Sequence, residues 1–385
     1  MPALPDDTLA LLRLVQAGGR MAPRRLLLAT HGTATDAVSA GRTAWRAAGL
    51  EPDQITALSA PDQTLERARD WLERPGHHLI GIHDPHYPAL LAQMPAPPLA
   101  LFVAGDPSLL WHPSVAVVGS RAATAGGRDQ ARRFAVALCR AGLAVTSGLA
   151  AGIDAAAHLA ALEADGITIA VLGTGPDLAY PRHHAALQER IADRGAVVSE
   201  YPPGTEARPG HFPARNRIIA GLSLGTLVVE AAARSGALIT ARQAAEAGRE
   251  VFALPGSVLN PQARGCHRLI RDGACLVEAP EEVLAGIAPL AGQLALALTP
   301  DDAEPAPLDD ASASLENQTG QPDLDHHRLW RALGHDPTPM DVLVERTGLT
   351  AATLSSMLLH MELDGRVAVE HGRYARRSTG GGAVA

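Results

Sequence analysis

The segment RPGHFPARNR, residues 208–217, holds the densest group of side chains suited to binding an anion. It sets Arg208, Arg215 and Arg217 around Phe212, in a chain with four each of Phe, Tyr and Trp, and Glu206 stands just before it. Guanidinium groups bind phosphate oxygens, while an exposed ring stacks on a base of any identity. The segment therefore indicates a site for single-stranded nucleic acid. The alternative is a core Phe212 with arginines on a helix end.

Two further segments place small or polar residues directly after an apolar strand. VAVVG ends in Gly119 and leads into Ser120 and Arg121, and a second strand is followed by SGLAAG, residues 147–152. Bare backbone amides and a helix N-terminus both bind phosphate. We expect these two strand ends to form a phosphate cradle. In the alternative interpretation, Ser120 only caps a helix and Arg121 is a solvated surface charge.

The sequence offers little for catalysis, metal binding or a cofactor. Asp154 and His158 lie four residues apart on one helical face, but Asp154 is better explained as offsetting the positive helix end and His158 as a packed side chain. The 16 histidines include no pair at zinc-ligand spacing. GTG at 173–175 lacks the last glycine of the dinucleotide fingerprint, because position 178 is Leu. We expect no metal and no cofactor.

The elements that position these residues are apolar runs of strand length alternating with helical stretches. Such alternation is typical of an α/β fold with a parallel sheet, whose strands are apolar along their length because helices cover both faces. The predicted strands are residues 115–119, 143–148, 167–173, 196–200, 226–230, 250–256 and 274–278.

Length and charge set the limits of this interpretation. The 385 residues favour two to three domains, and 46% hydrophobic and 19% charged residues are typical of a globular chain. Residues 291–325 contain eight acids and no base, which equals the whole net charge of −8. The remaining chain is nearly neutral, so a DNA site must be a local patch. All 33 basic residues are Arg, which suggests compositional bias.

The pattern along the chain predicts five segments. Residues 1–75 are punctuated short helices, and residues 76–290 carry the strand and helix alternation. Residues 291–325 are acidic and Pro-rich and lack an apolar face, which predicts a flexible linker. Residues 326–378 suggest three helices and a hairpin, the order of a winged helix, and residues 379–385 a disordered tail.

The sequence favours a cytoplasmic protein. Its three cysteines form no CxxC, and Asp6 and Asp7 stand where a signal peptide has basic residues. The uncharged stretch 283–300 contains two Pro and has acidic flanks, which disfavours a membrane helix.

Several motifs together carry a family resemblance. Taken in order, GSR (119–121), SGLAAGIDAAAH (147–158), YP (180–181), FPARNRIIAGLS (212–223), SGALITA (235–241) and LPG (254–256) resemble the DNA-processing protein A (DprA or Smf) family. The flanks are similar to that family as well, with a helical sterile-alpha-motif-like domain in front and a winged helix behind.

The resemblance implies an extended Rossmann fold without catalysis that binds single-stranded DNA, forms a homodimer and helps to load the RecA recombinase during natural transformation. Arg208 stands near the place where many relatives carry a Lys before the Phe. The implied dimer contacts are Leu269, Ile270 and Leu276. The DNA-contacting set carried over by motif is Gly119, Ser120, Arg121, Ser147, Gly148, Gly152, Arg208, Phe212, Arg215, Asn216, Arg217, Ser235 and Gly236.

A second family is the alternative. Nucleoside-monophosphate phosphoribohydrolases on a related Rossmann fold carry a PGG..GT..E signature, and GTLVVE at 225–230 preserves the GT and the Glu. Ser223 and Leu224 replace the paired glycines, so the phosphate-binding turn is incomplete. Glu230 would be the catalytic acid of such an enzyme. We expect it instead to accept hydrogen bonds from loop amides at the end of a buried strand.

Overall fold

The computed structural model describes residues 4–59, 63–298, 328–330, 332–333, 338–363, 366–370 and 373–376. It divides into two compact units, residues 1–302 and 303–385.

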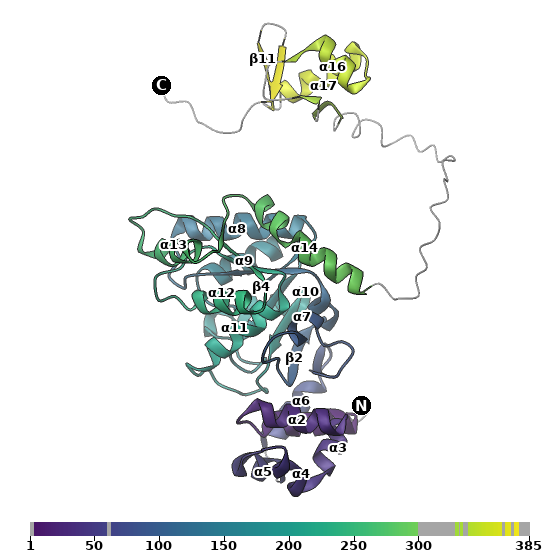
Figure 1. Ribbon diagram of the computed structural model, residues 1–385, viewed down its shortest axis with the longest axis vertical. Coiled ribbons are helices and arrows are strands. Elements are labelled where there is room, and N and C mark those ends of the chain that lie inside the picture. The colour runs from purple at the N-terminus through teal and green to yellow at the C-terminus, as the bar shows by residue number, and fades with distance from the viewer. Residues whose placement is uncertain are drawn as a thin grey trace, which may run out of the picture. The chain divides into compact units, whose positions relative to one another are not determined.

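The first unit begins with helices at its lower end in Figure 1, and these helices share a hydrophobic core with the sheet. Leu12, Leu14 and Trp45 belong to the same buried cluster as Phe102 and Val197 of the sheet. The predicted short helices at the N-terminus are present, and three more follow them. The helices are α1 (Asp6–Gln16), α2 (Met21–His31), α3 (Ala34–Ser39), α4 (Gly41–Ala47), α5 (Pro52–Ser59) and α6 (Gln63–Leu72).

A nine-stranded sheet forms the centre of the unit, in the order β1-β2-β6-β5-β4-β3-β7-β8-β9. All seven predicted strands are present and pair in parallel, which confirms the α/β fold class. They are β3 (Ser114–Val118), β4 (Ala144–Ser147), β5 (Thr168–Leu172), β6 (Ala196–Ser199), β7 (Gly225–Val228), β8 (Glu250–Ala253) and β9 (Cys275–Leu276). The antiparallel strands β1 (His77–Gly81) and β2 (Ala100–Gly105) were not predicted, and they extend the sheet beyond β6.

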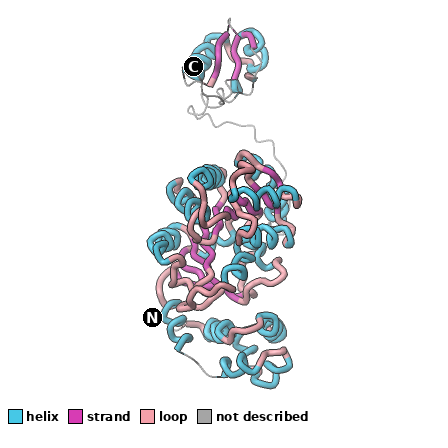
Figure 2. The backbone as a smooth tube through the Cα atoms, turned by 90° about the vertical axis from the view of Figure 1, so that its left-hand side faces the viewer, coloured by secondary structure: helices cyan, strands magenta, loops and turns pink. Residues whose placement is uncertain are grey.

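Helices cover both faces of the sheet, as Figure 2 shows around the strands in magenta. Along β3, Val115 and Val117 point into one apolar cluster and Ala116 and Val118 into the other. Helices α8 (Ala125–Arg140), α9 (Ile153–Glu163) and α14 (Pro280–Leu298) contribute to the first cluster. The second receives α7 (Ala89–Ala92), α11 (His211–Leu222), α12 (Ala237–Glu246) and α13 (Arg264–Arg271). The remaining elements are α10 (Ala185–Arg194) and the short 3₁₀ helices η1 (Pro107–Trp111), η2 (Arg182–His184) and η3 (Pro261–Ala263).

The strand order identifies where a ligand can bind. From β3 the chain moves to β4 on one side, and it later returns to β7 on the other side. Loops that leave β3 and β7 in opposite directions open a crevice at their carboxyl ends, which is the usual ligand site of an open α/β sheet. The loop with Gly119, Ser120 and Arg121 is one of the two.

The predicted linker start at residue 291 is wrong by eight residues. Helix α14 continues to Leu298 because Ala291 and Leu294 pack against the sheet's apolar cluster. The rest of the predicted linker, 299–325, and the tail 379–385 lie outside the described residues. In the part of the chain that is described, no helix is long and apolar enough to span a membrane.

The second unit contains a small core around Leu329, Leu343, Leu358 and Val367. The expected second and third helices correspond to α16 (Met340–Thr347) and α17 (Ala351–Leu363). The expected hairpin is present as the antiparallel strands β11 (Val367–Glu370) and β12 (Arg373–Arg376), and β10 (Thr338–Pro339) pairs with β12.

Candidate nucleic-acid interface

A groove of about 730 Å³ lies at the crevice between β3 and β7. Among its lining residues Arg121, Arg215 and Arg234 are cationic, and Asp154 is the one acid in the described lining. The groove also contains the start of α12, where Ser235 and Gly236 precede the helix. Helix amides and guanidinium groups around one cavity favour an anionic ligand.

The loop after β3 presents Arg121 to this groove. Ser120 is buried, and its hydroxyl accepts a hydrogen bond from the Ala122 amide at 3.1 Å, which closes a tight turn. The alternative in which Ser120 caps α8 is wrong, because Thr124 caps it by accepting from the Gly127 amide at 3.0 Å. Arg121 is exposed and forms no ion pair among the described residues. Its charge is therefore available to a phosphate.

Glu230, at the end of β7, fastens this loop at both ends. Its carbonyl oxygen accepts from the Ser120 amide at 2.7 Å. Its carboxylate accepts from the amide of Thr124 at 2.9 Å and from the Thr124 hydroxyl at 2.6 Å. The expectation that Glu230 accepts from loop amides is confirmed. A carboxylate occupied in this way is poorly suited to act as the catalytic acid of a phosphoribohydrolase.

Glycines allow the second strand end to pack under the first. Gly152 has φ +86°, and a Cβ there would collide with the carbonyl oxygens of Ser120 and Arg121. Gly148 touches the Arg215 guanidinium so closely that a Cβ would overlap it. Ser147 is buried and donates its hydroxyl to the Val117 carbonyl at 2.6 Å. Ser147, Gly148 and Gly152 are absent from the groove lining, so they support the site and do not face it.

Arg215 differs most from its predicted role as a free phosphate contact. Only 4% of the residue is exposed, and its guanidinium donates to the carbonyl oxygens of Gly148, at 2.7 Å, and Val171. Burial lowers the pKa of Arg215 to about 10, against the opposing charge of Asp154. The Asp154 carboxylate accepts from the Gly148 amide at 3.1 Å, and burial raises its pKa. Arg215 therefore ties two strand ends together beneath the groove.

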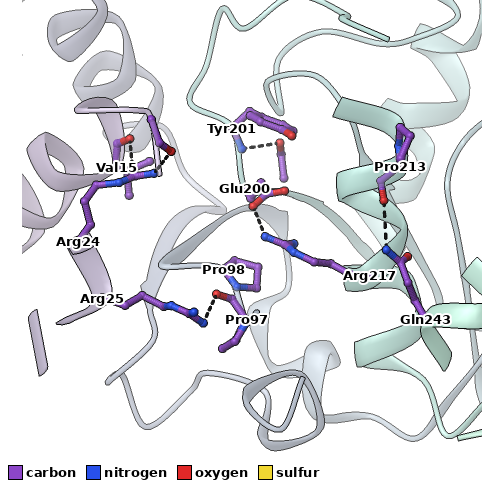
Figure 3. Close-up of polar contacts among 12 residues, drawn as sticks. Val15, Arg24, Arg25, Pro97, Pro98, Glu200, Tyr201, Pro213, Arg217 and Gln243 are labelled. Carbon is purple, nitrogen blue, oxygen red and sulfur yellow. Dashed lines mark hydrogen bonds and ion pairs between the residues drawn. The ribbon is translucent and has the colours of Figure 1, made fainter. Parts of the chain in front are cut away.

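Arg217, which was predicted to contact DNA, is not among the residues that line the groove. Its guanidinium pairs with Glu200 at 2.6 Å, with both side chains largely buried (Figure 3). An arginine neutralised by a buried carboxylate has little charge left for a phosphate. Arg208 remains exposed beside the groove, next to the lining residue Pro209.

The expected exposed ring of Phe212 is half-buried in the groove wall. The Arg121 guanidinium carbon lies 5.2 Å from the centre of this ring, and the ring centroid of Tyr180 is 5.1 Å away. The Gly173 backbone packs against it, since a Cβ there would lie 3.0 Å from Phe212 Cδ1. Asn216 lines the groove and donates to the Gly236 carbonyl at 3.3 Å.

His158 is a structural residue and forms no catalytic pair with Asp154. Its Nδ1 lies 2.7 Å from the Thr168 hydroxyl, which itself donates to the Val145 carbonyl at 2.8 Å. Burial lowers the pKa of His158 to about 3, helped by the charge of Arg215. The packed interpretation is therefore the correct one. Among the described residues no group of His, Cys, Asp and Glu could hold a metal ion.

Two residues that line the groove were not predicted from the sequence. Arg234 lies in the loop after β7 and Tyr180 in the loop after β5, and both line the groove. The YP motif at 180–181 was one available signal for Tyr180, whereas Arg234 stood among many arginines. The sheet topology brings both to the same edge.

The predicted dimer contacts differ in exposure. Leu276 in β9 is 47% exposed, whereas Leu269 and Ile270 pack partly against the chain's own core. The nearby loop after β8 exposes Val258 and Leu259 by 79% and 86%. This edge of the sheet therefore carries exposed apolar surface. Of the three predicted dimer contacts, Leu276 contributes most to it.

Residues 78–288, more than half of the chain, match the family described as DNA recombination-mediator protein A. The chain belongs to this family. Residues 299–373 match the DprA winged helix domain, in agreement with the predicted winged helix. The chain is 44% identical to Protein Smf of Escherichia coli strain K12 over 325 residues, which cover 83% of this chain and 82% of that protein.

The chain is also similar to DNA processing protein A of Streptococcus pneumoniae, both in sequence and in structure. DNA processing protein DprA of Streptococcus pneumoniae is 50% identical over 206 residues, which cover 54% of this chain and 73% of that protein. The X-ray structure of DNA processing protein A from the same species aligns with a TM-score of 0.64 and 36% identity, and it covers 74% of this chain and 98% of that one. The family is therefore one of DNA recombination mediators, and the fold is shared with a solved member.

Proposed function

We propose that this protein binds single-stranded DNA in the groove between β3 and β7, and that it helps to load the RecA recombinase onto DNA that enters during natural transformation. The observation that carries the proposal is the groove itself. Arg121 and Arg234 are exposed there, and the one acid of the described lining, Asp154, is buried and hydrogen-bonded. Phosphates supply the negative charge that such a groove favours.

Single strands fit the groove better than a duplex does. Its wall contains aromatic rings, which bind a base only when the base is unstacked. Base identity is therefore not read, and affinity depends on phosphate contacts and on stacking.

A fluorescence-anisotropy titration with short single- and double-stranded oligonucleotides at two salt concentrations tests the binding step. We expect tighter binding of the single strand and a clear loss of affinity at the higher salt. Equal affinity for both, or no binding, would contradict the proposal. Incubation with a nucleoside monophosphate should release no free base, which separates this function from phosphoribohydrolase activity.

We further propose a homodimer through the edge strand β9, where Leu276 and the loop with Val258 and Leu259 offer apolar surface. Two copies joined edge to edge place two grooves along one strand of DNA. Light scattering at micromolar concentration should give twice the mass of the 40.0 kDa chain. A Leu276→Asp variant should give the monomer mass. RecA's DNA-dependent ATP hydrolysis, with and without this protein, tests the loading step.

A further inference from the structure

The YP motif at 180–181 has no part in the proposed phosphate contacts, although Tyr180 lines the groove. Tyr180 is 44% exposed. Among the described Phe, Tyr and Trp residues, the other exposed one is Trp111, which is 36% exposed and lies outside the groove lining. Tyr180 thus offers the most accessible ring surface of the site.

Phe212 is less available than its position in the arginine-rich segment suggests. The Arg121 guanidinium lies over its ring at 5.2 Å from the centroid. A base that stacked on that side would first have to displace a cation, and it would also break the cation–π contact. Phe212 is therefore better placed to support Arg121 and Tyr180 than to receive a base.

The loop that carries Tyr180 is braced at several points. The Thr174 hydroxyl donates to the Leu178 carbonyl at 2.6 Å, and the Gln188 side chain donates to the Pro176 carbonyl at 2.7 Å. Asp177 accepts from the Gly204 amide at 2.7 Å and pairs with Arg67 of α6 at 2.6 Å. A ring held on a braced loop loses little conformational entropy when a base stacks on it.

We propose that Tyr180 is a base-stacking platform of the groove, with Phe212 as the support behind it and Arg121 as the neighbouring phosphate contact. The proposal rests on the proposed function, because it assigns a role within the same DNA-binding groove. The two rings meet at 41°, with centroids 5.1 Å apart, so Phe212 buttresses Tyr180 and leaves it part-exposed to the groove. A nucleotide bridging Tyr180 and Arg121 places its base on the ring and its phosphate on the guanidinium.

The test compares two single strands of equal length in full-length protein, one of thymidines and one in which abasic residues replace the bases. Both carry the same phosphates, so only the first can stack. We expect Tyr180→Leu to bind the thymidine strand about tenfold more weakly, within the range measured for loss of one stacked base, and to bind the abasic strand as wild type does. Tyr180→Phe should retain wild-type affinity for both strands.

Trp111→Leu is the matched control, because it removes an exposed aromatic ring outside the groove, and it should change neither affinity.

A second measurement does not depend on affinity: 2-aminopurine in the bound strand should be quenched by the wild type and not by Tyr180→Leu. Three results would overturn the inference and leave DNA binding intact. Tyr180→Leu could lose affinity equally for both strands, or it could quench 2-aminopurine as the wild type does. The third is a base-dependent loss of affinity that occurs in Phe212→Leu and not in Tyr180→Leu. Failure of the wild type to bind either strand would overturn the proposed function itself, and the inference with it.

Discussion

The carboxylate of Glu230 accepts both the backbone amide and the hydroxyl of Thr124, at 2.9 and 2.6 Å. Because the Glu230 carbonyl also accepts from Ser120, one residue at the end of β7 fixes both ends of the loop that presents Arg121. The two residues are 106 positions apart in the sequence, and the sheet topology makes them neighbours. The loop that presents Arg121 is thus held in place by the end of β7, on the other side of the crevice.

Glu230→Gln should weaken single-strand binding several-fold while the salt dependence stays that of the wild type. A glutamine can keep the bond from the Thr124 amide through Oε1, but its Nε2 group then meets the Thr124 hydroxyl, which must turn to accept, and the Asn260 side-chain amide, which loses its acceptor. The loop therefore loosens. The number of phosphate contacts does not change. Anisotropy titrations at several salt concentrations measure both quantities.

Thr124→Ser is the control for that variant, because it keeps the hydroxyl, the amide and the cap of α8, and it should bind as wild type does. Thr124→Val should resemble Glu230→Gln and should also lower the stability of the fold by about 1 kcal/mol through loss of the cap. Wild-type affinity in both Glu230→Gln and Thr124→Val would contradict the positioning role.

Sequence patterns were sufficient for the parallel strands and for the crevice, because apolar runs and turn residues report local structure directly. They did not distinguish an arginine that faces solvent from one that faces the backbone. Arg215 is buried because Gly148, 67 residues away, has no side chain in its path. Arg217 is neutralised by Glu200, which follows a different strand. Such outcomes depend on the tertiary neighbours, which a residue pattern does not contain.

Arg121→Ala should weaken binding of every single-stranded sequence and reduce the salt slope by roughly one unit, the amount expected for one lost phosphate contact. Arg190→Ala is the matched control, since Arg190 is also exposed but lies on α10 outside the groove lining. Anisotropy against the logarithm of salt concentration gives both slopes. If the two variants gave the same slope, Arg121 would be an ordinary surface charge.

Arg215→Met should destabilise the fold by about 2–4 kcal/mol, because it removes the donors to the Gly148 and Val171 carbonyls and the cation nearest to buried Asp154. The urea midpoint, followed by circular dichroism, measures this loss. Arg215→Lys keeps the charge but lacks the planar guanidinium group, so its urea midpoint should lie between those of the wild type and Arg215→Met. A variant with wild-type stability and lost DNA binding would return Arg215 to the contact set.

His158 should make the protein less stable at acidic pH. Its Nδ1–H donates to Thr168, and Nε2 is buried with no hydrogen-bond partner among the described residues. The folded pKa of about 3 lies below the ordinary value of 6.5, so between these values only the unfolded chain binds the proton. The contribution of neutral His158 to the free energy of unfolding is therefore complete above about pH 6.5. It is lost progressively as the pH falls toward 3, and the loss is about 2 kcal/mol at pH 5.

The measurement is the difference in urea midpoint between wild type and His158→Leu at pH 7 and at pH 5. Taking the difference removes titrating groups that do not interact with His158, since they contribute equally to both proteins. The leucine variant lacks the buried imidazole, so its midpoint should fall less than that of the wild type on acidification. Thr168→Val keeps the imidazole buried and should retain the steep wild-type dependence, because the group that resists protonation is still present. A pH-independent difference between wild type and His158→Leu would mean that water reaches Nε2 and that the imidazole titrates freely in the fold.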